Sequence, residues 1–388
     1  MRGQISPHGL TSAQQLDFRV SVDFLLAYEG SLGTFNSYRR EVERLLQWVW
    51  RVKSNSLKDI SRKEIEEYLS FCKKPPKTWI GLRKYRRFIS QDGVRVPNSK
   101  WRPFVATVSK VAYRNGERPD KKAFELSPDS TRELFAILSS FFGYLLSEEY
   151  VQISPVALIR QKSKYIQRRQ SLPKIRRLSN ASWQTIIEST RELAEDQPER
   201  YERSLFIVTA LYAMYLRISE VAASERWTPT MNDFGKDESD NWWFTTVGKG
   251  NKMRQIAVSD AMLLGLKRWR RYLGLSSLPS PADSSPLVPK LRGNGPVTSS
   301  DYVRELVQEC FDRAVEALRD DGKDEDAEVL AEATVHWLRH TGISEDVKRR
   351  PREHVRDDAG HSSSAITDKY IDVELHERHK SAKRKPLS

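Results

Sequence analysis

The 388-residue chain is poor in cysteine and contains no long uncharged apolar run. Its two cysteines, Cys72 and Cys310, lie far apart and belong to no CxxC or Cys/His spacing, so the sequence predicts neither a disulfide framework nor a zinc site. No segment approaches the roughly 18 apolar residues of a membrane span, and the first residues lack the apolar stretch of a secretion signal. We therefore expect a protein of the reducing cytoplasm without a membrane partner.

The motifs of nucleotide-dependent and metal-dependent enzymes are also missing. The sequence has neither a GxxxxGK[ST] phosphate-binding loop nor a carboxylate constellation of the kind that holds catalytic metals. We expect no metal and no cofactor.

Positive charge, in contrast, is abundant. Lys and Arg total 65 against 52 Asp and Glu, which gives a net charge of +13, and 38% of the residues are hydrophobic, enough to build cores. Such an excess indicates a partner that carries many phosphates, and nucleic acid is favoured over an anionic membrane. A basic chain can also owe its charge to solubility alone, so a partner must be argued from a site.

Length and charge pattern predict two domains joined by a basic linker: a helical domain over 1–159, the linker over 160–178, and a second domain with its C-terminal tail over 179–388. The linker region contains eight cations and no acid, and Pro173 discourages a continuous helix. A solvated tether is one interpretation; we favour contact with a DNA backbone. The candidate DNA-binding residues are Arg160, Lys162, Lys164, Arg168, Arg169, Lys174, Arg176 and Arg177.

The first domain is expected to be mostly helical. Apolar residues recur at helical spacing from Ser12 to about Trp50, a capping box at residues 61–64 opens a third helix, and Pro128 begins a fourth. Residues 77–116 instead interleave Arg and Lys with aromatic residues. This stretch is either a surface that follows phosphates or a small subdomain with an aromatic core.

The second domain is predicted to begin with a helix capped by Ser179 or Asn180 and to be interrupted by one β-hairpin. The β-rich runs 242–247 and 255–258 flank the turn GKGNK, which places lysines at the hairpin tip. The fold class is therefore mainly α with a small β-hairpin or sheet.

Two pairs of residues in this domain can hold a phosphate. Arg217 and Glu220 are three residues apart on a helical segment, so the carboxylate can orient a guanidinium whose fork grips two phosphate oxygens. His336 and Arg339 have the same spacing in HWLRHT and add a second guanidinium beside an imidazole. Taken alone, the first pair is usually only a surface ion pair, and the second is better explained as a helix with exposed His and Arg side chains.

A histidine and a tyrosine follow near the C-terminus. His361 in GHSS precedes Tyr370 by nine residues. Tyr370 could be a core aromatic, because most tyrosines on a final helix are. A phenol becomes a useful nucleophile only where strong positive charge stabilises the phenolate and the phosphorane, which two arginines and a lysine would supply.

Taken in order along the chain, these positions resemble the active-site set of the tyrosine recombinases, the phage integrase family. The matching catalytic positions are Arg217, Lys249, His336, Arg339, His361 and Tyr370. The resemblance implies that the arginines clamp the scissile phosphate, that Tyr370 attacks it, that Lys249 is the general acid, and that Glu220 supports the site. It also leaves Lys252, on the same turn, as a second candidate for the acid.

The resemblance further implies a two-domain clamp around double-stranded DNA, with a helical core-binding domain and a catalytic domain, that performs integration, excision or resolution of a mobile element. The partners implied are a specific recombination site, three further copies in a synaptic homotetramer, and an accessory DNA-binding protein. The sequence departs from the family at Asp357 and Asp358, where leucines are common, which predicts a differently packed or more exposed segment before His361.

Two other functions fit parts of the pattern. A type IB topoisomerase would use the same phosphotyrosine chemistry, although GHSS ahead of the tyrosine favours a recombinase. A sequence-specific DNA-binding regulator on the same scaffold would need no catalysis, but such a protein is expected to lose a catalytic residue and none is lost.

Overall fold

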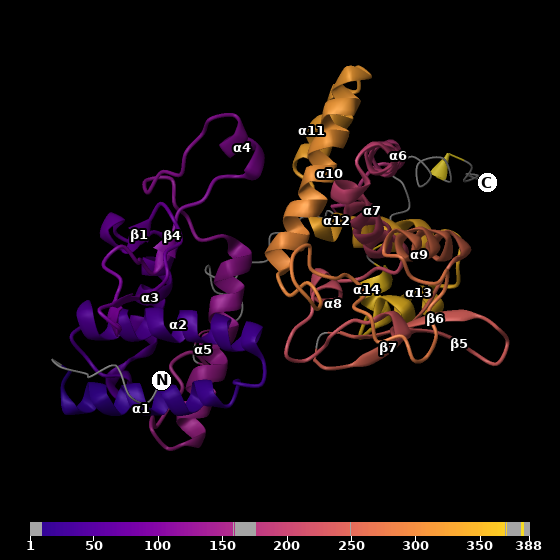
Figure 1. Cartoon of the computed structure of the whole chain (residues 1–388). Helices are drawn as coiled ribbons and strands as arrows, with labels where there is room; N and C mark the ends of the chain where they lie inside the picture. The colour runs from indigo at the N-terminus through magenta and orange to yellow at the C-terminus, as the bar shows by residue number, and fades with distance from the viewer. Residues whose placement is uncertain are drawn as a thin grey trace, which may run out of the picture. The chain divides into compact units, whose positions relative to one another are not determined.

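The structure is a computed structural model, which describes residues 10–157, 159, 176–248, 250–368, 370 and 382–383. The chain divides into two compact units, residues 1–170 and 171–388 (Figure 1). Both are built mainly of helices with small sheets, which confirms the predicted fold class. Within the described ranges, no helix is long and apolar enough to cross a bilayer.

Four long helices form the first unit, as the apolar spacing predicts. They are α1 (Ser12–Leu26), α2 (Leu32–Arg51), α3 (Arg62–Lys73) and α5 (Pro128–Ser147). Ser61 caps α3 in the predicted capping box with Glu64. Their apolar faces share one core, with Phe24, Leu45 and Phe141 almost fully buried.

A buried carboxylate fastens this core together. Asp17 on α1 accepts hydrogen bonds from Trp50 Nε1 (3.0 Å), Ser56 Oγ (2.9 Å) and the Tyr150 hydroxyl (2.8 Å), and from the backbone N–H of Leu57 at the start of the 3-10 turn η1 (Leu57–Asp59). All these donors satisfy one buried anion, so we assign Asp17 a structural role.

Residues 77–116 form a small β-containing insertion. After the turn η2 (Lys77–Trp79), strand β1 (Ile80–Gly81) pairs in parallel with β4 (Phe104–Val105). Between them, β2 (Phe88–Gln91) and β3 (Val94–Pro97) make an antiparallel hairpin, and the short helix α4 (Lys110–Arg114) follows. The hairpin was not predicted. Its turn residues Asp92 and Gly93 have φ of 52° and 75°, the left-handed conformation that Asp-Gly favours in tight hairpins.

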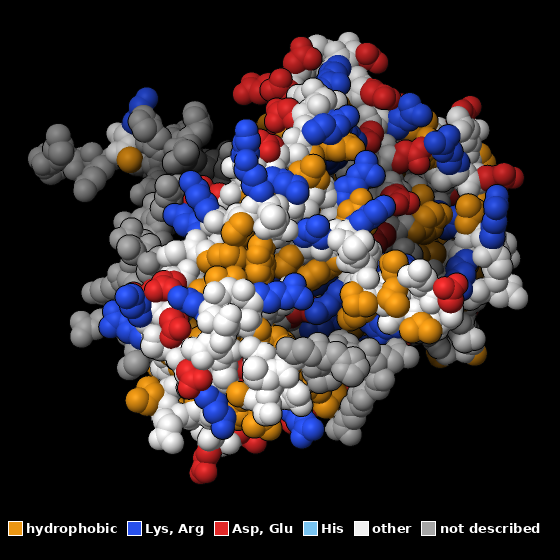
Figure 2. Space-filling model, turned by 90° about the vertical axis from the view of Figure 1, so that its left-hand side faces the viewer, with side chains coloured by type: hydrophobic (Ala, Val, Ile, Leu, Met, Phe, Trp, Pro, Cys, Tyr) orange, Lys and Arg blue, Asp and Glu red, His pale blue; other side chains and the backbone are white. Residues whose placement is uncertain are grey.

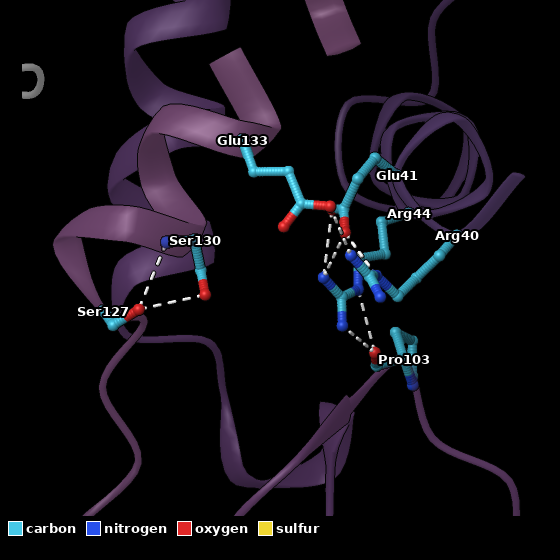
Figure 3. A network of polar contacts seen from close by, with 7 residues as sticks. All are labelled: Arg40, Glu41, Arg44, Pro103, Ser127, Ser130 and Glu133. Carbon is cyan, nitrogen blue, oxygen red and sulfur yellow. Dashed lines mark hydrogen bonds and ion pairs between the residues drawn. The ribbon is translucent and has the colours of Figure 1, made fainter. Parts of the chain in front are cut away.

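Helix α2 holds the base of this insertion in place (Figure 3). Arg44 donates from Nε and Nη2 to the Pro103 carbonyl (2.9 and 2.7 Å), is paired with Glu41, and lies 4.4 Å from the ring centroid of Phe104. Phe104 is fully buried. The aromatic-core interpretation of 77–116 therefore describes the base of the insertion, while most of the cations lie outside that core.

The second unit contains the remaining elements. They are α6 (Asn180–Asp196), α7 (Pro198–Ala213), α8 (Ile218–Val221), η3 (Met231–Asp233), α9 (Asp260–Tyr272), α10 (Ser300–Asp320), α11 (Asp324–Ala331), α12 (Val335–Asp346), α13 (Arg352–Ala359) and α14 (Ser364–Asp368).

The sheet of this unit has the order β5-β6-β7, all antiparallel: β5 (Phe234–Lys236), β6 (Trp242–Val247) and β7 (Met253–Ala257). The predicted hairpin is thus confirmed as β6 and β7. Strand β5 was not predicted, because its three residues are too few to show a period.

Helices α7 and α12 pack so closely that one position requires glycine. A β-carbon on Gly342 would overlap the Tyr212 carbonyl oxygen. This contact fixes α12, which carries His336 and Arg339, against the end of α7, and Arg217 lies four residues after that end.

Candidate active site

The first site residue stands where the chain turns between α7 and α8. Helix α7 ends at Ala213, Tyr215 has a left-handed φ of 50°, and Arg217 is the N-cap of α8. The backbone N–H of Arg217 donates to Glu220 Oε2 (2.8 Å), and its Nη1 donates to Glu220 Oε1 (3.0 Å). The predicted pairing of Arg217 with Glu220 is present.

A third residue, Arg254 on β7, completes this pair. Its Nη1 and Nη2 donate to both oxygens of Glu220 (2.7 and 2.8 Å), and its Nε donates to the Asp358 carbonyl (2.9 Å). The Glu220 side chain is 1% exposed and that of Arg217 is 25% exposed. Arg217 and Arg254 both bind the buried Glu220 carboxylate, but part of the Arg217 guanidinium is exposed and can bind a ligand. These cations hold the pKa of Glu220 below its ordinary value, although burial acts to raise it.

Two glycines make room for Arg254. A β-carbon on Gly248 would lie 2.9 Å from Arg254 Nη1, and one on Gly360 would lie 2.8 Å from Arg254 Cδ. Gly360 also has φ of 63° as the C-cap of α13. The hairpin turn and the end of α13 therefore approach the same guanidinium from two directions.

The second arginine of the site is held by backbone carbonyls. Arg339 is 4% exposed, and its Nη1 donates to the Tyr215 carbonyl while its Nη2 donates to the Ala359 carbonyl (2.5 Å). Burial, together with the positive charge of Arg217, lowers the pKa of Arg339 to about 9. A fixed cation short of counter-charge attracts an anion.

Tyr370 lies between two imidazoles. Its hydroxyl is 2.6 Å from His340 Nδ1, and its ring stacks on that of His361 with centroids 5.6 Å apart and an interplanar angle of 17°. His361 Nδ1 in turn is 2.8 Å from Thr367 Oγ1. The Tyr370 side chain packs against Tyr215 and is 7% exposed. Tyr370 is therefore both a core aromatic and a member of the site.

The electrostatics join these groups into one centre. Burial raises the pKa of Tyr370, whereas the charges of Arg339 and Arg217 act to lower it. Burial also lowers the pKa of both His340 and His361 to about 4, so both are neutral near pH 7. A neutral His340 can accept the phenolic proton.

His336 stands one turn before His340 on α12, at a ring centroid distance of 6.2 Å. It is exposed, yet desolvation by its neighbours lowers its pKa, and the charges of Arg339 and Arg217 add to this effect. His336 is thus near the two arginines, but the imidazole within hydrogen-bond distance of the Tyr370 hydroxyl is that of His340.

The acidic residues before Gly360 have distinct environments. Asp358 is buried: its Oδ2 accepts from Arg350 Nη2 (2.6 Å) and its Oδ1 accepts from the backbone N–H of Ala257 (3.3 Å). Asp357 is paired with Arg356. The charged segment is therefore packed through ion pairs and hydrogen bonds, and only part of the expected exposure is found.

Most of the remaining predicted residues lie outside the described ranges. Lys249 lies outside the described residues, and Lys252 is exposed at the hairpin turn, where its carbonyl accepts from the Gly248 N–H (2.8 Å). Of the eight linker cations, only Arg176 and Arg177 are described. Just after them, the N–H of buried Leu178 donates to Thr341 Oγ1 on α12 (2.9 Å).

In the part of the chain that the structure describes, no group of three or more His, Cys, Asp or Glu side chains is placed to hold a metal ion. Among the residues described, the positive charges of the site come from arginines.

The second unit carries the buried Tyr370 close enough to Arg217 and Arg339 for their charges to affect its pKa. The fold of the whole chain is similar to those of solved recombinases and integrases. It is similar to the XerH site-specific recombinase in a post-cleavage complex with palindromic difH substrate, with 18% identity, a TM-score of 0.57, and coverage of 97% of this chain and 86% of that one.

Two integrases are similar as well. The Tn1549 transposon integrase in complex with transposon right end DNA has 12% identity, a TM-score of 0.52, and coverage of 96% and 99%. A lambda integrase tetramer bound to a Holliday junction has 14% identity, a TM-score of 0.51, and coverage of 98% and 84%. No protein-family model matches the sequence, and no curated protein matches it.

Sequence reasoning missed Arg254 and His340. Both lie next to residues that were predicted: Arg254 comes two residues after Lys252, and His340 comes directly after Arg339. The signal for Arg254 was its place on a strand next to the lysine turn, and the signal for His340 was its spacing of four residues from His336, which puts both on one helical face.

Proposed function

We propose that this protein is a site-specific DNA recombinase that cleaves and rejoins strands through a phosphotyrosine at Tyr370. One observation carries the proposal: within a fold shared with DNA recombinases, Tyr370 is hydrogen-bonded to His340 at 2.6 Å and electrostatically coupled to Arg217 and Arg339. A neutral acceptor on the phenol and two cations beside it are what attack on a phosphodiester requires.

In the proposed reaction, the Tyr370 oxygen forms a bond to phosphorus while the bond from phosphorus to the 5′ oxygen breaks. The phenolic proton passes to His340 Nδ1, and the departing 5′ oxygen takes a proton from the general acid, for which we propose Lys249. The product is a 3′-phosphotyrosyl enzyme and a free 5′-hydroxyl. Attack by a 5′-hydroxyl of another strand reverses these steps and joins the exchanged strands.

The two arginines differ in how accessible their guanidinium groups are to a phosphate. Arg217 has its Nη1 committed to Glu220 and a quarter of its side chain exposed, so we assign it contact with a non-bridging oxygen. Arg339 is bound to two carbonyls, and we assign it charge stabilisation at close range.

The other predicted residues keep supporting roles in the proposal. His361 is a hydrogen-bond donor to the phosphate, His336 a proton donor or acceptor near the arginines, and Lys252 the second candidate for the general acid. We assign Arg254 the role of a positioning residue, because it touches Glu220 and not the open side of Arg217.

The partner is double-stranded DNA with a recombination site, bound by several copies of the chain, and we expect four in the synapse together with an accessory DNA-binding protein. The protein acts on DNA in the cytoplasm, in integration, excision or resolution of a mobile element. In this proposal, the helical residues 1–159 form the core-binding domain, 160–178 the basic linker, and 179–388 the catalytic domain.

A covalent trapping experiment tests the proposal. Nicked suicide duplexes are cut from DNA that flanks the gene, incubated with the protein, and resolved under denaturing conditions. We expect a covalent adduct with the native chain, a phosphopeptide that contains Tyr370, and no adduct with Tyr370→Phe. Tyr272→Phe, an exposed tyrosine on α9, is the matched control and should keep the adduct.

The outcomes separate the candidate functions. An adduct that persists in Tyr370→Phe sinks the assignment of the nucleophile. Tight binding without an adduct makes the chain a DNA-binding regulator. Relaxation of any supercoiled plasmid without site preference indicates a type IB topoisomerase, for which the same two arginines would serve.

A further inference from the structure

The insertion between α3 and α5 carries an unusual share of the positive charge. Residues 77–116 contain ten Lys or Arg and one acid, Asp92, so nine of the thirteen net positive charges of the chain lie in this stretch. Five of these cations are exposed side chains on and around the β2–β3 hairpin, which we name the hairpin cations: Arg83, Lys84, Arg86, Arg95 and Lys100.

The hairpin cations lack the counter-charges found elsewhere on this surface. In the described part of the chain, none of the five forms an ion pair, whereas the exposed cations Lys73 and Arg62 in the same unit pair with Glu125 and Glu66. Figure 2 shows Lys and Arg side chains, together with hydrophobic and acidic ones, on one face of the molecule. Cations without acidic partners are available to an anionic ligand.

The hairpin is held rigidly enough to present these charges. At its base, Arg87 pairs with Glu43 on α2, and its guanidinium lies 5.1 Å from the Trp101 ring centroid. Asn98 closes the loop, since its N–H donates to the Arg87 carbonyl (2.7 Å) and its Nδ2 donates to the Arg86 carbonyl (2.8 Å). An ordered presentation lowers the entropy lost on binding.

The two faces of the hairpin have different chemistry. Arg95 lies over the Phe88 ring at 4.4 Å on one face, while Ile89 and Val94, which are 44% and 61% exposed, belong to the other face. Burial, with the nearby charges of Arg39 and Arg95, lowers the pKa of Arg87 to about 10.

We propose that the β2–β3 hairpin is a second DNA-contacting element, in which the hairpin cations bind backbone phosphates of duplex DNA. A two-stranded ribbon fits the major groove, where exposed Ile and Val side chains can contact thymine methyl groups. This proposal rests on the proposed function for its partner and adds a contact surface outside the unit that bears Tyr370.

The salt dependence of binding to a duplex of arbitrary sequence tests it, because such binding is governed by phosphate contacts. Affinity is measured by fluorescence anisotropy from about 50 to 200 mM salt for the full chain and for the triple variant Arg83→Gln, Lys84→Gln, Arg86→Gln. Each lost contact makes the slope of log K against log salt shallower by about 0.9. We expect a change of about 2 or more and at least tenfold weaker binding at low salt.

The control removes the same charge from cations that already have acidic partners. Lys236, Arg313 and Lys323 are paired with Asp240, Glu316 and Asp321. Their triple change to Gln matches the loss of three charges, and its salt slope should equal that of the native chain. Equal slopes for the two triple variants would overturn the proposal, and so would binding of the native hairpin to anionic lipid vesicles in preference to DNA. A circular-dichroism melt confirms that each variant is folded.

Covalent trapping keeps this proposal distinct from the proposed function. At saturating protein, the hairpin variant should form as much adduct as the native chain. If the native chain never forms an adduct while the slope still changes, the hairpin surface stands and the recombinase assignment falls. If the native chain forms the adduct but the hairpin variant has the salt slope of the native chain, the recombinase assignment stands and the hairpin surface falls.

Discussion

The Tyr370 centre and the β2–β3 hairpin both concentrate cations, but they handle them in opposite ways. Around Tyr370, buried Glu220 and Asp358 and several backbone carbonyls hold the guanidiniums of Arg254, Arg339 and Arg350 in fixed positions. The hairpin cations have no ion-pair partner among the described residues. Stabilisation of a transition state requires positive charges in fixed positions. Attraction of a polyanion requires only exposed positive charges without acidic partners.

The largest expected effect comes from breaking the fixed network at Arg254. In Arg254→Gln the buried Glu220 carboxylate loses its bidentate partner, and Arg217 loses its support. Removal of one member of a buried ion pair costs roughly 3 kcal/mol of stability, and a displaced guanidinium lowers the rate of adduct formation up to about 100-fold. Single-turnover trapping and urea unfolding measure the two effects.

Arg268→Gln is the control for this change. Arg268 on α9 also donates two hydrogen bonds to a carboxylate outside the site, from Nε and Nη2 to Glu202 Oε1 (2.8 and 2.7 Å). It should lose stability but keep the adduct rate of its folded fraction. Arg254→Lys should recover part of the stability and little of the rate, because an ammonium lacks the fork. Equal rates in Arg254→Gln and Arg268→Gln would remove the positioning role.

The next effect is expected at His340, where the rate falls without the loss of a buried ion pair, because the change touches proton transfer alone. His340→Leu removes the acceptor on Tyr370, and we expect adduct formation to slow about 100-fold, the lower range for general base catalysis. His340→Asn retains an acceptor near the position of Nδ1 and should be less affected. DNA affinity and its salt slope should stay unchanged, in contrast to the hairpin variant.

The exposed His354 on α13 provides the comparison, since His354→Leu should leave the rate unaltered. The pH profile adds a second readout: with a pKa of about 4, His340 stays neutral from pH 8 down to about 5, so its contribution is constant there and disappears as the pH falls through about 4. A His340→Leu enzyme with native rate and profile would contradict proton transfer to this imidazole.

The smallest effect is on stability at mild acid pH. An unfolded histidine protonates near pH 6.5, whereas His340 and His361 in the folded chain protonate only near pH 4. Between these values the unfolded state binds more protons, so stability falls as the pH drops from about 6.5 towards 4. Thermal melts should show a loss of about a few degrees over that range. The double change of both residues to Gln should flatten the dependence, and an unchanged pH dependence would refute the assignment.

The sequence predicted the parts of the fold that follow a local rule. Ser61 with Glu64 and Pro128 marked helix starts correctly, because capping and ring geometry act over a few residues. The β2–β3 hairpin escaped prediction, although Asp92-Gly93 is a strong turn signal. Its flanking strands are short and mostly exposed, so they lack the alternation that marks a buried strand.

Within the site, the sequence predicted only the residues that belong to known motifs. Glu220 was predicted as a support for Arg217, yet its stronger contacts are with Arg254, from a strand that pairing brings close. Asp358 looked misplaced in an apolar position, and only the fold supplies Arg350 as its partner. Such partners are set by tertiary contact, which no spacing along the chain encodes.

Gly248 and Gly360, which leave space for the Arg254 side chain, restrict how the sequence can change. Seen separately, one belongs to a hairpin turn and the other to a helix end. Both leave space for the same side chain, because a β-carbon at either position would lie within 3.0 Å of an Arg254 atom. In related sequences, we expect these three positions to change together or not at all.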